Sequence, residues 1–201
     1  MRKKIIIVSI IVVAFVSGYF IGHKRPTEST FHDMIVNHAH ELSTLVTPGD
    51  KRVLDLAIDL QTPENAYQYV QDHIRDDLAI PALPAGDIIS KGRASCLGKA
   101  ILLCSLYRAM GFPADDVRIV TGELAYPDAI IDHAWVDIEY NGECLQQDAT
   151  DLLGRYKFDQ FKGMAYTRRF IRKEGYAFND AHFAVVSRLN LLKGTGHPAV
   201  Q

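Results

Sequence analysis

The sequence predicts an α+β fold in which helices pack on a small antiparallel sheet. Two helix signals lie in the first half of the chain: Thr62-Pro63-Glu64 is typical of a helix start, and Gly111 closes an apolar stretch that begins at Cys96. In the second half, Asn141-Gly142 separates two alternating runs and is a strong hairpin signal. Helices that precede strands, rather than alternate with them, favour α+β over a parallel α/β sheet.

The composition describes a folded, mildly acidic protein. The chain has 201 residues, 48% hydrophobic and 23% charged, which suits one folded domain with attachments rather than a disordered chain. Residues 1–25 contain five basic residues and no acidic one, so the remaining 176 residues carry 17 basic and 24 acidic side chains, a net charge of −7. Such a domain binds polyanions poorly, and the sequence has no glycine-rich phosphate loop. We therefore expect neither nucleic acid nor a nucleotide as a partner.

Residues 5–22 form an uncharged apolar segment between basic flanks. A helix of this length spans about 27 Å, close to the ~30 Å hydrocarbon core of a bilayer. We expect residues 1–25 to be an uncleaved transmembrane anchor that holds an exported domain, residues 26–201, on the periplasmic or extracellular side of a membrane. The alternative is a signal peptide cleaved near Val16-Ser17-Gly18, which would release a secreted protein.

The pattern of apolar and turn residues predicts the other elements in order. Helices are expected over residues 31–46, 51–60, 62–78 and 96–110, with a loop over 79–87. Strands are expected over residues 117–123, 133–140 and 143–148, and a further helix over 178–192.

A two-residue loop at Asn141-Gly142 fixes the register of the predicted hairpin. Tyr140 would pair with Glu143, which makes His133 and Asp148 diagonal neighbours on one face. Their β-carbons would lie roughly 7 Å apart, a gap that a carboxylate–imidazole hydrogen bond can bridge. Such a bond fixes the tautomer and the orientation of the ring.

Cys96 is the candidate nucleophile for this imidazole. It follows Ser95, a good helix-capping residue, and opens the helix predicted over residues 96–110. The helix dipole and the free N–H groups at a helix N-terminus stabilise a thiolate, and a nearby imidazolium stabilises it further. The backbone N–H of Cys96 would also point toward an oxyanion formed at an acyl carbon. Cys96, His133 and Asp148 are therefore the predicted catalytic residues.

Four segments in this order resemble the transglutaminase-like core of the papain-like cysteine enzymes. They are Gly92-Arg93-Ala94-Ser95-Cys96, the helix that ends at Arg108-Ala109-Met110-Gly111-Phe112-Pro113, His133-Ala134-Trp135-Val136-Asp137, and Asp148-Ala149-Thr150. The resemblance covers roughly residues 60–155. It implies a papain-like α+β fold, with Cys96 as nucleophile, His133 as general base and acid, and Asp148 as the residue that orients the ring. The family often has glycine two residues before its cysteine, where this chain has Ala94.

The resemblance also implies acyl transfer from an amide through a thioester, without a cofactor. We expect a cysteine amidohydrolase, either a peptidase or an amidase, that acts on a peptide or isopeptide carbonyl of a peptide or protein substrate. Hydrolysis is preferred because the sequence offers no separate module for binding an acceptor. Three alternatives stay open: a protein-glutamine acyltransferase (transglutaminase), a catalytically silent peptide-binding module of the same fold, and a structural envelope protein.

Some neighbouring residues have competing interpretations. Trp135 would either form a wall of the substrate cleft or pack in the core. Asp132 and Asp137 compete with Asp148 as the partner of His133. Asp137 shares a face of the hairpin with His133 but does not occupy the family's motif position. The sequence leaves these alternatives open.

The other cysteines, the histidines and a basic cluster have simpler explanations. Cys104 lies among apolar residues and is expected to pack in the core, so a disulfide with Cys144 is not favoured. No standard zinc spacing is present among the candidate ligands, so we expect a polar helix face and no metal at His32, His38, His40 and Glu41. A solvated helix face is expected, with contact to anionic lipid headgroups as the alternative, at Arg168, Arg169, Arg172 and Lys173.

Overall fold

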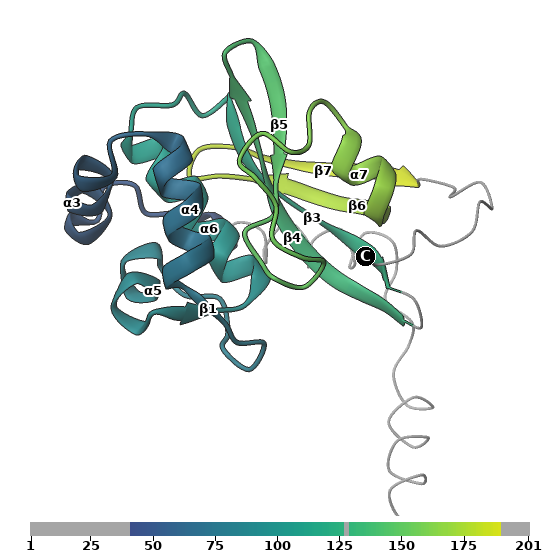
Figure 1. Ribbon diagram of the computed structural model, residues 1–201, viewed down its shortest axis with the longest axis horizontal. Helices are drawn as coiled ribbons and strands as arrows, with labels where there is room; N and C mark the ends of the chain where they lie inside the picture. The colour runs from purple at the N-terminus through teal and green to yellow at the C-terminus, as the bar shows by residue number, and fades with distance from the viewer. Residues whose placement is uncertain (1–40, 127–128, 190–201) are drawn as a thin grey trace, which may run out of the picture. The chain divides into compact units, whose positions relative to one another are not determined.

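Within the described residues, helices come first and cover one face of the sheet that follows them. The structure of the protein, a computed structural model, describes residues 41–126 and 129–189 (Figure 1). The helices before the main sheet are α3 (Lys51–Leu60), α4 (Pro63–His73), α5 (Ala85–Lys91) and α6 (Cys96–Ala109). The other three pack against α6, and α6 packs against the sheet (Figure 1). The predicted α+β architecture is confirmed.

The main sheet is antiparallel and has the strand order β5-β4-β3-β6-β7 within the described residues. Its elements are β3 (Val117–Tyr126), β4 (Ala129–Tyr140), β5 (Glu143–Gln147), β6 (Ile171–Phe178) and β7 (Phe183–Leu189), with the short helix α7 (Ala165–Phe170) before β6. A separate pair of short parallel strands, β1 (Arg75–Asp76) and β2 (Arg93–Ala94), lies next to α5 and α6 in the chain. β2 ends just before the helix that carries Cys96, so this pair fixes where that helix begins.

Helix α4 begins where the sequence predicts but ends earlier. The Thr62 side chain accepts a hydrogen bond from the Asn65 N–H, with Pro63 in the first helical position. The predicted helix to residue 78 is wrong, because the chain leaves the helix after His73 and pairs with β2 through Arg75 and Asp77. Residues 85–87 of the predicted loop likewise belong to α5.

The predicted hairpin is confirmed together with its register. Asn141 and Gly142 both have positive φ angles, 53° and 77°, as a two-residue turn of this kind needs. Tyr140 pairs with Glu143, and the ladder runs as far as Val136 opposite Gln147. Beyond Gln147 the chain leaves the ladder, so Asp148 is held by other contacts.

Both faces of the hairpin are covered. The face of Ala134, Val136 and Ile138 packs into the core that contains α6, as its apolar character predicts. The opposite face belongs to a second buried cluster, in which Trp135 packs with aromatic residues from the segment after Asp148. In the sequence, the residues of that face are mostly polar, so the pattern does not indicate that the face is buried. In the structure, these polar side chains hydrogen-bond one another beneath the aromatic cluster.

The helix predicted over residues 178–192 is wrong. Phe183–Leu189 forms β7, which pairs antiparallel with β6, and the turn between them is held by Asn179. The Asn179 side-chain oxygen accepts hydrogen bonds from the N–H groups of Ala181 and His182. The tertiary pairing with β6 therefore decides the conformation of this segment.

The predicted membrane anchor cannot be compared with the structure. The anchor at residues 1–25, the helix start at residue 31, and His32, His38 and His40 lie outside the described residues. Among the helices that the structure describes, none has the length and apolar character to cross a bilayer. The same residues hold no cluster of potential metal ligands.

Candidate active site

Cys96 is the first residue of α6 and is partly exposed. The Ser95 side chain caps this helix and accepts a hydrogen bond from the Gly98 N–H at 3.4 Å. Because the N–H groups of a first helical turn have no partners within the helix, they surround the Cys96 backbone with hydrogen-bond donors. The local sequence thus places a thiol at a site where negative charge is stabilised.

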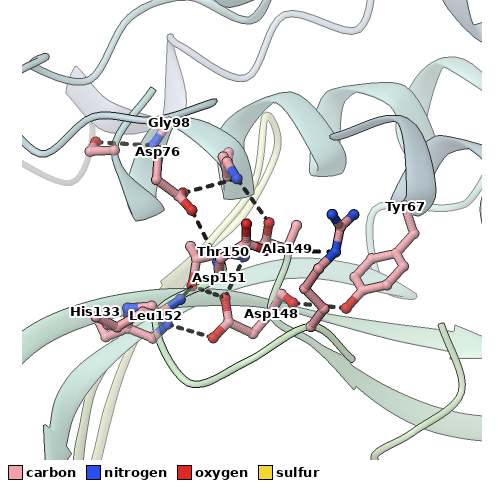
Figure 2. Close-up of polar contacts among 12 residues, drawn as sticks. Tyr67, Asp76, Gly98, His133, Asp148, Ala149, Thr150, Asp151 and Leu152 are labelled. Atoms are coloured by element: carbon pink, nitrogen blue, oxygen red, sulfur yellow. Dashed lines mark hydrogen bonds and ion pairs between the residues drawn. The ribbon is translucent and has the colours of Figure 1, made fainter. Parts of the chain in front are cut away.

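His133 and Asp148 meet as the hairpin register predicts. His133 lies on β4 and Asp148 follows β5, and the distance between His133 Nε2 and Asp148 Oδ2 is 3.0 Å. Their side chains are only 1% and 0% exposed, so water does not compete for this hydrogen bond. Figure 2 shows the two side chains at the edge of a larger set of polar contacts.

Three further residues hold Asp148 through four hydrogen bonds. Its Oδ1 accepts hydrogen bonds from the N–H and the hydroxyl of Thr150, at 2.9 and 2.8 Å. Its Oδ2 accepts from the Tyr166 hydroxyl at 2.8 Å, beside the bond from His133. The Asp148 backbone carbonyl accepts from the Tyr67 hydroxyl at 2.8 Å (Figure 2). The carboxylate therefore has one defined orientation.

Sequence reasoning missed the three residues that hold Asp148. Thr150 was detectable, because an Asp that bonds the backbone two residues later is a common local turn. Tyr166 and Tyr67 come from distant helices and carry no local signal in the sequence.

Burial and hydrogen bonding act in opposite directions on the pKa of His133. Burial lowers that pKa, but the hydrogen bond to Asp148 and the interaction with the Cys96 side chain outweigh it and raise the pKa to about 10. The other ring nitrogen, Nδ1, is buried and has no hydrogen-bond partner among the described residues. Since Nε2 is taken by Asp148, Nδ1 is the nitrogen that can exchange a proton with Cys96.

Asp148 is held in its charged form. Burial raises its pKa, but the hydrogen bond from His133 and those from Thr150 lower it by more, so the pKa lies below its ordinary value of 3.8. A charged carboxylate beside the ring favours the imidazolium, and an imidazolium stabilises a thiolate.

Trp135 and the competing aspartates lie away from this contact. Trp135 is 1% exposed, and its Nε1–H donates to Asp137 Oδ1 at 3.0 Å, so packing rather than a cleft wall describes its position. Asp137 also accepts a hydrogen bond from Arg118, with an N–O distance of 2.9 Å. Asp132 is exposed to solvent.

The three cysteines are free thiols in very different surroundings. Cys104 is fully buried, and burial raises its pKa strongly. Burial and nearby carboxylates also raise the pKa of Cys144, to about 12. Cys96 alone of the three interacts with a histidine among the described residues, which makes it the thiol suited to nucleophilic chemistry.

The family model of the Transglutaminase-like superfamily matches residues 55–148, a range that contains Cys96, His133 and Asp148. This match identifies a transglutaminase-like domain in the chain. The helices α4 and α6 and the hairpin β4–β5 lie within this domain or at its edge.

Solved structures match this chain at low sequence identity. LapG of Legionella pneumophila is 17% identical, with a TM-score of 0.49, over 74% of this chain and 87% of that one. A protein of Cytophaga hutchinsonii, named as a candidate cysteine protease, is 16% identical with a TM-score of 0.46, over 79% of this chain and 58% of that one. A search of curated protein sequences found no match to this chain.

Proposed function

We propose that this transglutaminase-like domain is a cysteine hydrolase that cleaves a peptide or isopeptide bond. Cys96 would be the nucleophile, His133 the general base and acid, and Asp148 the residue that orients the ring. One observation carries the proposal: His133 Nε2 is fixed by Asp148 at 3.0 Å, while the buried Nδ1 has no hydrogen-bond partner among the described residues. An imidazole held in this way has one nitrogen reserved for a proton in transit.

The first half of the reaction forms a thioester. The Cys96 thiolate, paired with the His133 imidazolium, attacks the carbonyl carbon of the substrate amide, and a carbon–sulfur bond forms. The Cys96 backbone N–H would stabilise the resulting oxyanion. The imidazolium then gives its Nδ1 proton to the leaving amine as the carbon–nitrogen bond breaks. The products of this half are a free amine and an acyl-enzyme with a neutral imidazole.

The second half regenerates the enzyme. Neutral His133 takes a proton from a water molecule, whose oxygen attacks the thioester carbon. The carbon–sulfur bond breaks, the acid product leaves, and the thiolate–imidazolium pair is restored. A primary amine in place of water would give transamidation by the same steps, so the acceptor alone separates a hydrolase from a transglutaminase.

Thiol labelling tests the nucleophile without knowledge of the substrate. Cys96 should react with iodoacetamide at neutral pH much faster than Cys104 or Cys144, and His133→Ala should slow it. Peptide mapping by mass spectrometry distinguishes the three sites within one sample. Equal, slow rates at all three cysteines would contradict the proposal and favour a silent binding module.

Product analysis tests the reaction. A peptide library that includes isopeptide-linked members should give a thioester at Cys96, detected by its mass. The trapped acyl-enzyme is then offered water alone or water with a primary amine. Release of the free acid under both conditions supports hydrolysis, whereas exclusive amine incorporation would show a transglutaminase.

We further propose that residues 1–25 anchor the domain in a membrane, with residues 26–201 on the exported side. The support is the uncharged apolar segment at residues 5–22 between basic flanks. The full chain should appear in the membrane fraction and be digested by protease added from the exported side, while a chain that lacks residues 1–25 should not. Release of a shortened chain into the soluble exported fraction would show a cleaved signal peptide.

A further inference from the structure

Lys99 is a buried cation on the helix that carries Cys96. It lies three residues after Cys96, so both side chains project from the same side of α6. The Lys99 side chain is 2% exposed, and its ammonium lies 2.9 Å from Asp76 Oδ1. The same ammonium donates a hydrogen bond to the Ala149 backbone carbonyl at 3.1 Å. A lysine this deeply buried is uncommon and needs such partners.

Asp76 joins this lysine to the segment that follows Asp148. One carboxylate oxygen of Asp76 receives the Lys99 ammonium, and the other accepts a hydrogen bond from the Asp151 N–H at 3.0 Å. Lys99 and Asp76 together therefore hold the carbonyl of residue 149 and the N–H of residue 151. Figure 2 shows Asp76, Ala149 and Asp151 close to Asp148.

The segment after Asp148 needs these contacts because it has left the sheet. The β4–β5 ladder ends with Val136 opposite Gln147, so residues 148–151 have no place in it. Thr150, which bonds Asp148, belongs to this segment, so a displacement of the segment would also displace Asp148 and its bond to His133. Contacts from α6 and β1 fix the segment relative to Cys96.

Stability alone does not explain the burial of the Lys99 ammonium, whose carboxylate partner Asp76 is 36% exposed. An apolar side chain in place of a buried charge is often as stable as the paired charge, or more so. A role in positioning does explain why the lysine is buried there, because displacing a catalytic group by about one ångström greatly lowers the reaction rate.

We infer that Lys99 and Asp76 are positioning residues, which hold Asp148 and hence the His133 ring at the correct distance from the Cys96 thiol. The inference rests on the proposed function, since it takes Cys96 as the nucleophile. Neither residue touches the reacting atoms, and neither was identified from the sequence.

Three variants and one control test this inference in the full chain. Lys99→Met keeps the length of the side chain without its charge. Asp76→Asn replaces one of the two carboxylate oxygens, which bind the Lys99 ammonium and the Asp151 N–H, with an NH2 group. The third variant combines both changes. Val53→Ala is the control, because Val53 is fully buried on α3 and its truncation destabilises the core without touching this segment.

Two readouts separate position from stability. Amide hydrogen exchange at Asp151 measures how stably the segment after Asp148 is fixed. The pH profile of Cys96 alkylation by iodoacetamide measures whether a change in that segment alters the reactivity of the thiol. We expect Lys99→Met and Asp76→Asn to speed exchange at Asp151 and to slow alkylation at neutral pH about 10-fold, with a shifted pH profile. The double variant should be no slower than the slower single variant, because the two residues act as a unit. Val53→Ala should lower the melting temperature and leave the pH profile unchanged.

The outcomes that contradict the inference differ from those that contradict the proposed function. If wild-type Cys96 is rapidly alkylated and His133→Ala slows it, but neither Lys99→Met nor Asp76→Asn changes the pH profile, then the pair is structural and the inference fails. If wild-type Cys96 reacts no faster than Cys144, the proposed function fails, and the positioning role fails with it.

Discussion

The β-carbon of Ala94 lies so close to Gly98 that a β-carbon added at Gly98 would come within 2.8 Å of it. Ala94 is the last residue of β2, and Gly98 lies in the first turn of α6. The transglutaminase-like family often has glycine at the position of Ala94. Here Ala94 carries a methyl group, and the residue that faces it, Gly98, has none. This contact sets how closely the start of α6, with Cys96, approaches β2.

Gly98→Ala should therefore destabilise the protein and displace Cys96. Alanine is favoured over glycine in a helix by roughly 1 kcal/mol, so helix propensity alone predicts greater stability. Overpacking against Ala94 should reverse the sign, with a net loss of about 1–2 kcal/mol in the free energy of unfolding. Urea unfolding measures the loss, and iodoacetamide labelling of Cys96 should slow.

The compensating change provides the control for this prediction. Ala94→Gly combined with Gly98→Ala removes the close contact and should restore both stability and labelling rate. A double variant as impaired as Gly98→Ala alone would show that the contact with Ala94 is not the cause.

Asp148 and Asp137 should differ sharply when each is changed to asparagine. Asp148→Asn weakens the bond that orients His133, and we expect kcat on a cleaved peptide to fall about 10²–10⁴-fold. Asp137→Asn alters only the contacts to Trp135, Gln146 and Arg118. Its kcat should stay near that of the wild type, with some loss of thermal stability. Similar losses of kcat in both variants would contradict the assignment of Asp148 as the orienting residue.

The Tyr166 hydroxyl should contribute through Asp148. Tyr166→Phe keeps the ring in its aromatic cluster but removes the donor to Asp148 Oδ2. Because the acceptor is charged and buried, we expect a loss of about 1.5–3 kcal/mol in the free energy of unfolding and slower labelling of Cys96. The matched control is Tyr156→Phe, because the Tyr156 hydroxyl lies in the same cluster but donates to the Leu153 carbonyl. That variant should lose less stability and label at the wild-type rate.

The buried pair of His133 and Asp148 predicts how stability depends on pH. The pKa of His133 rises from 6.5 to about 10 on folding, so its contribution is complete below pH 6.5 and is lost as the pH rises toward 10. The pKa of Asp148 falls below 3.8, so its contribution is present above pH 3.8 and is lost at lower pH. The pair should therefore stabilise the protein most between these limits.

His133→Gln tests this pH dependence. The variant should be less stable than the wild type by roughly 3–5 kcal/mol near pH 5 to 6, since one partner of a buried pair is removed. The difference should shrink as the pH approaches 10. Chemical unfolding of both proteins across this range measures it, and a difference that grows with pH would contradict the raised pKa of His133.

Local sequence was sufficient for the parts of the site that depend on neighbours in the chain. Thr62 and Ser95 cap helices where the sequence predicts, because a capping side chain bonds backbone groups only a few residues away. Asn141-Gly142 sets the hairpin register, and that register brings His133 to Asp148. Local signals failed for residues 183–189, which become a strand only because β6 offers a partner.

The sequence by itself determined the hairpin with its register and the helix that begins at Cys96, because short-range turn and capping geometry specifies each of them. Only the tertiary structure decided that Tyr166 and Tyr67 bond Asp148, that Trp135 is buried, and that Lys99 and Asp76 hold the segment after Asp148. These contacts join residues from separate helices and strands. Their geometry depends on how the helices and the sheet pack together, which no local pattern encodes.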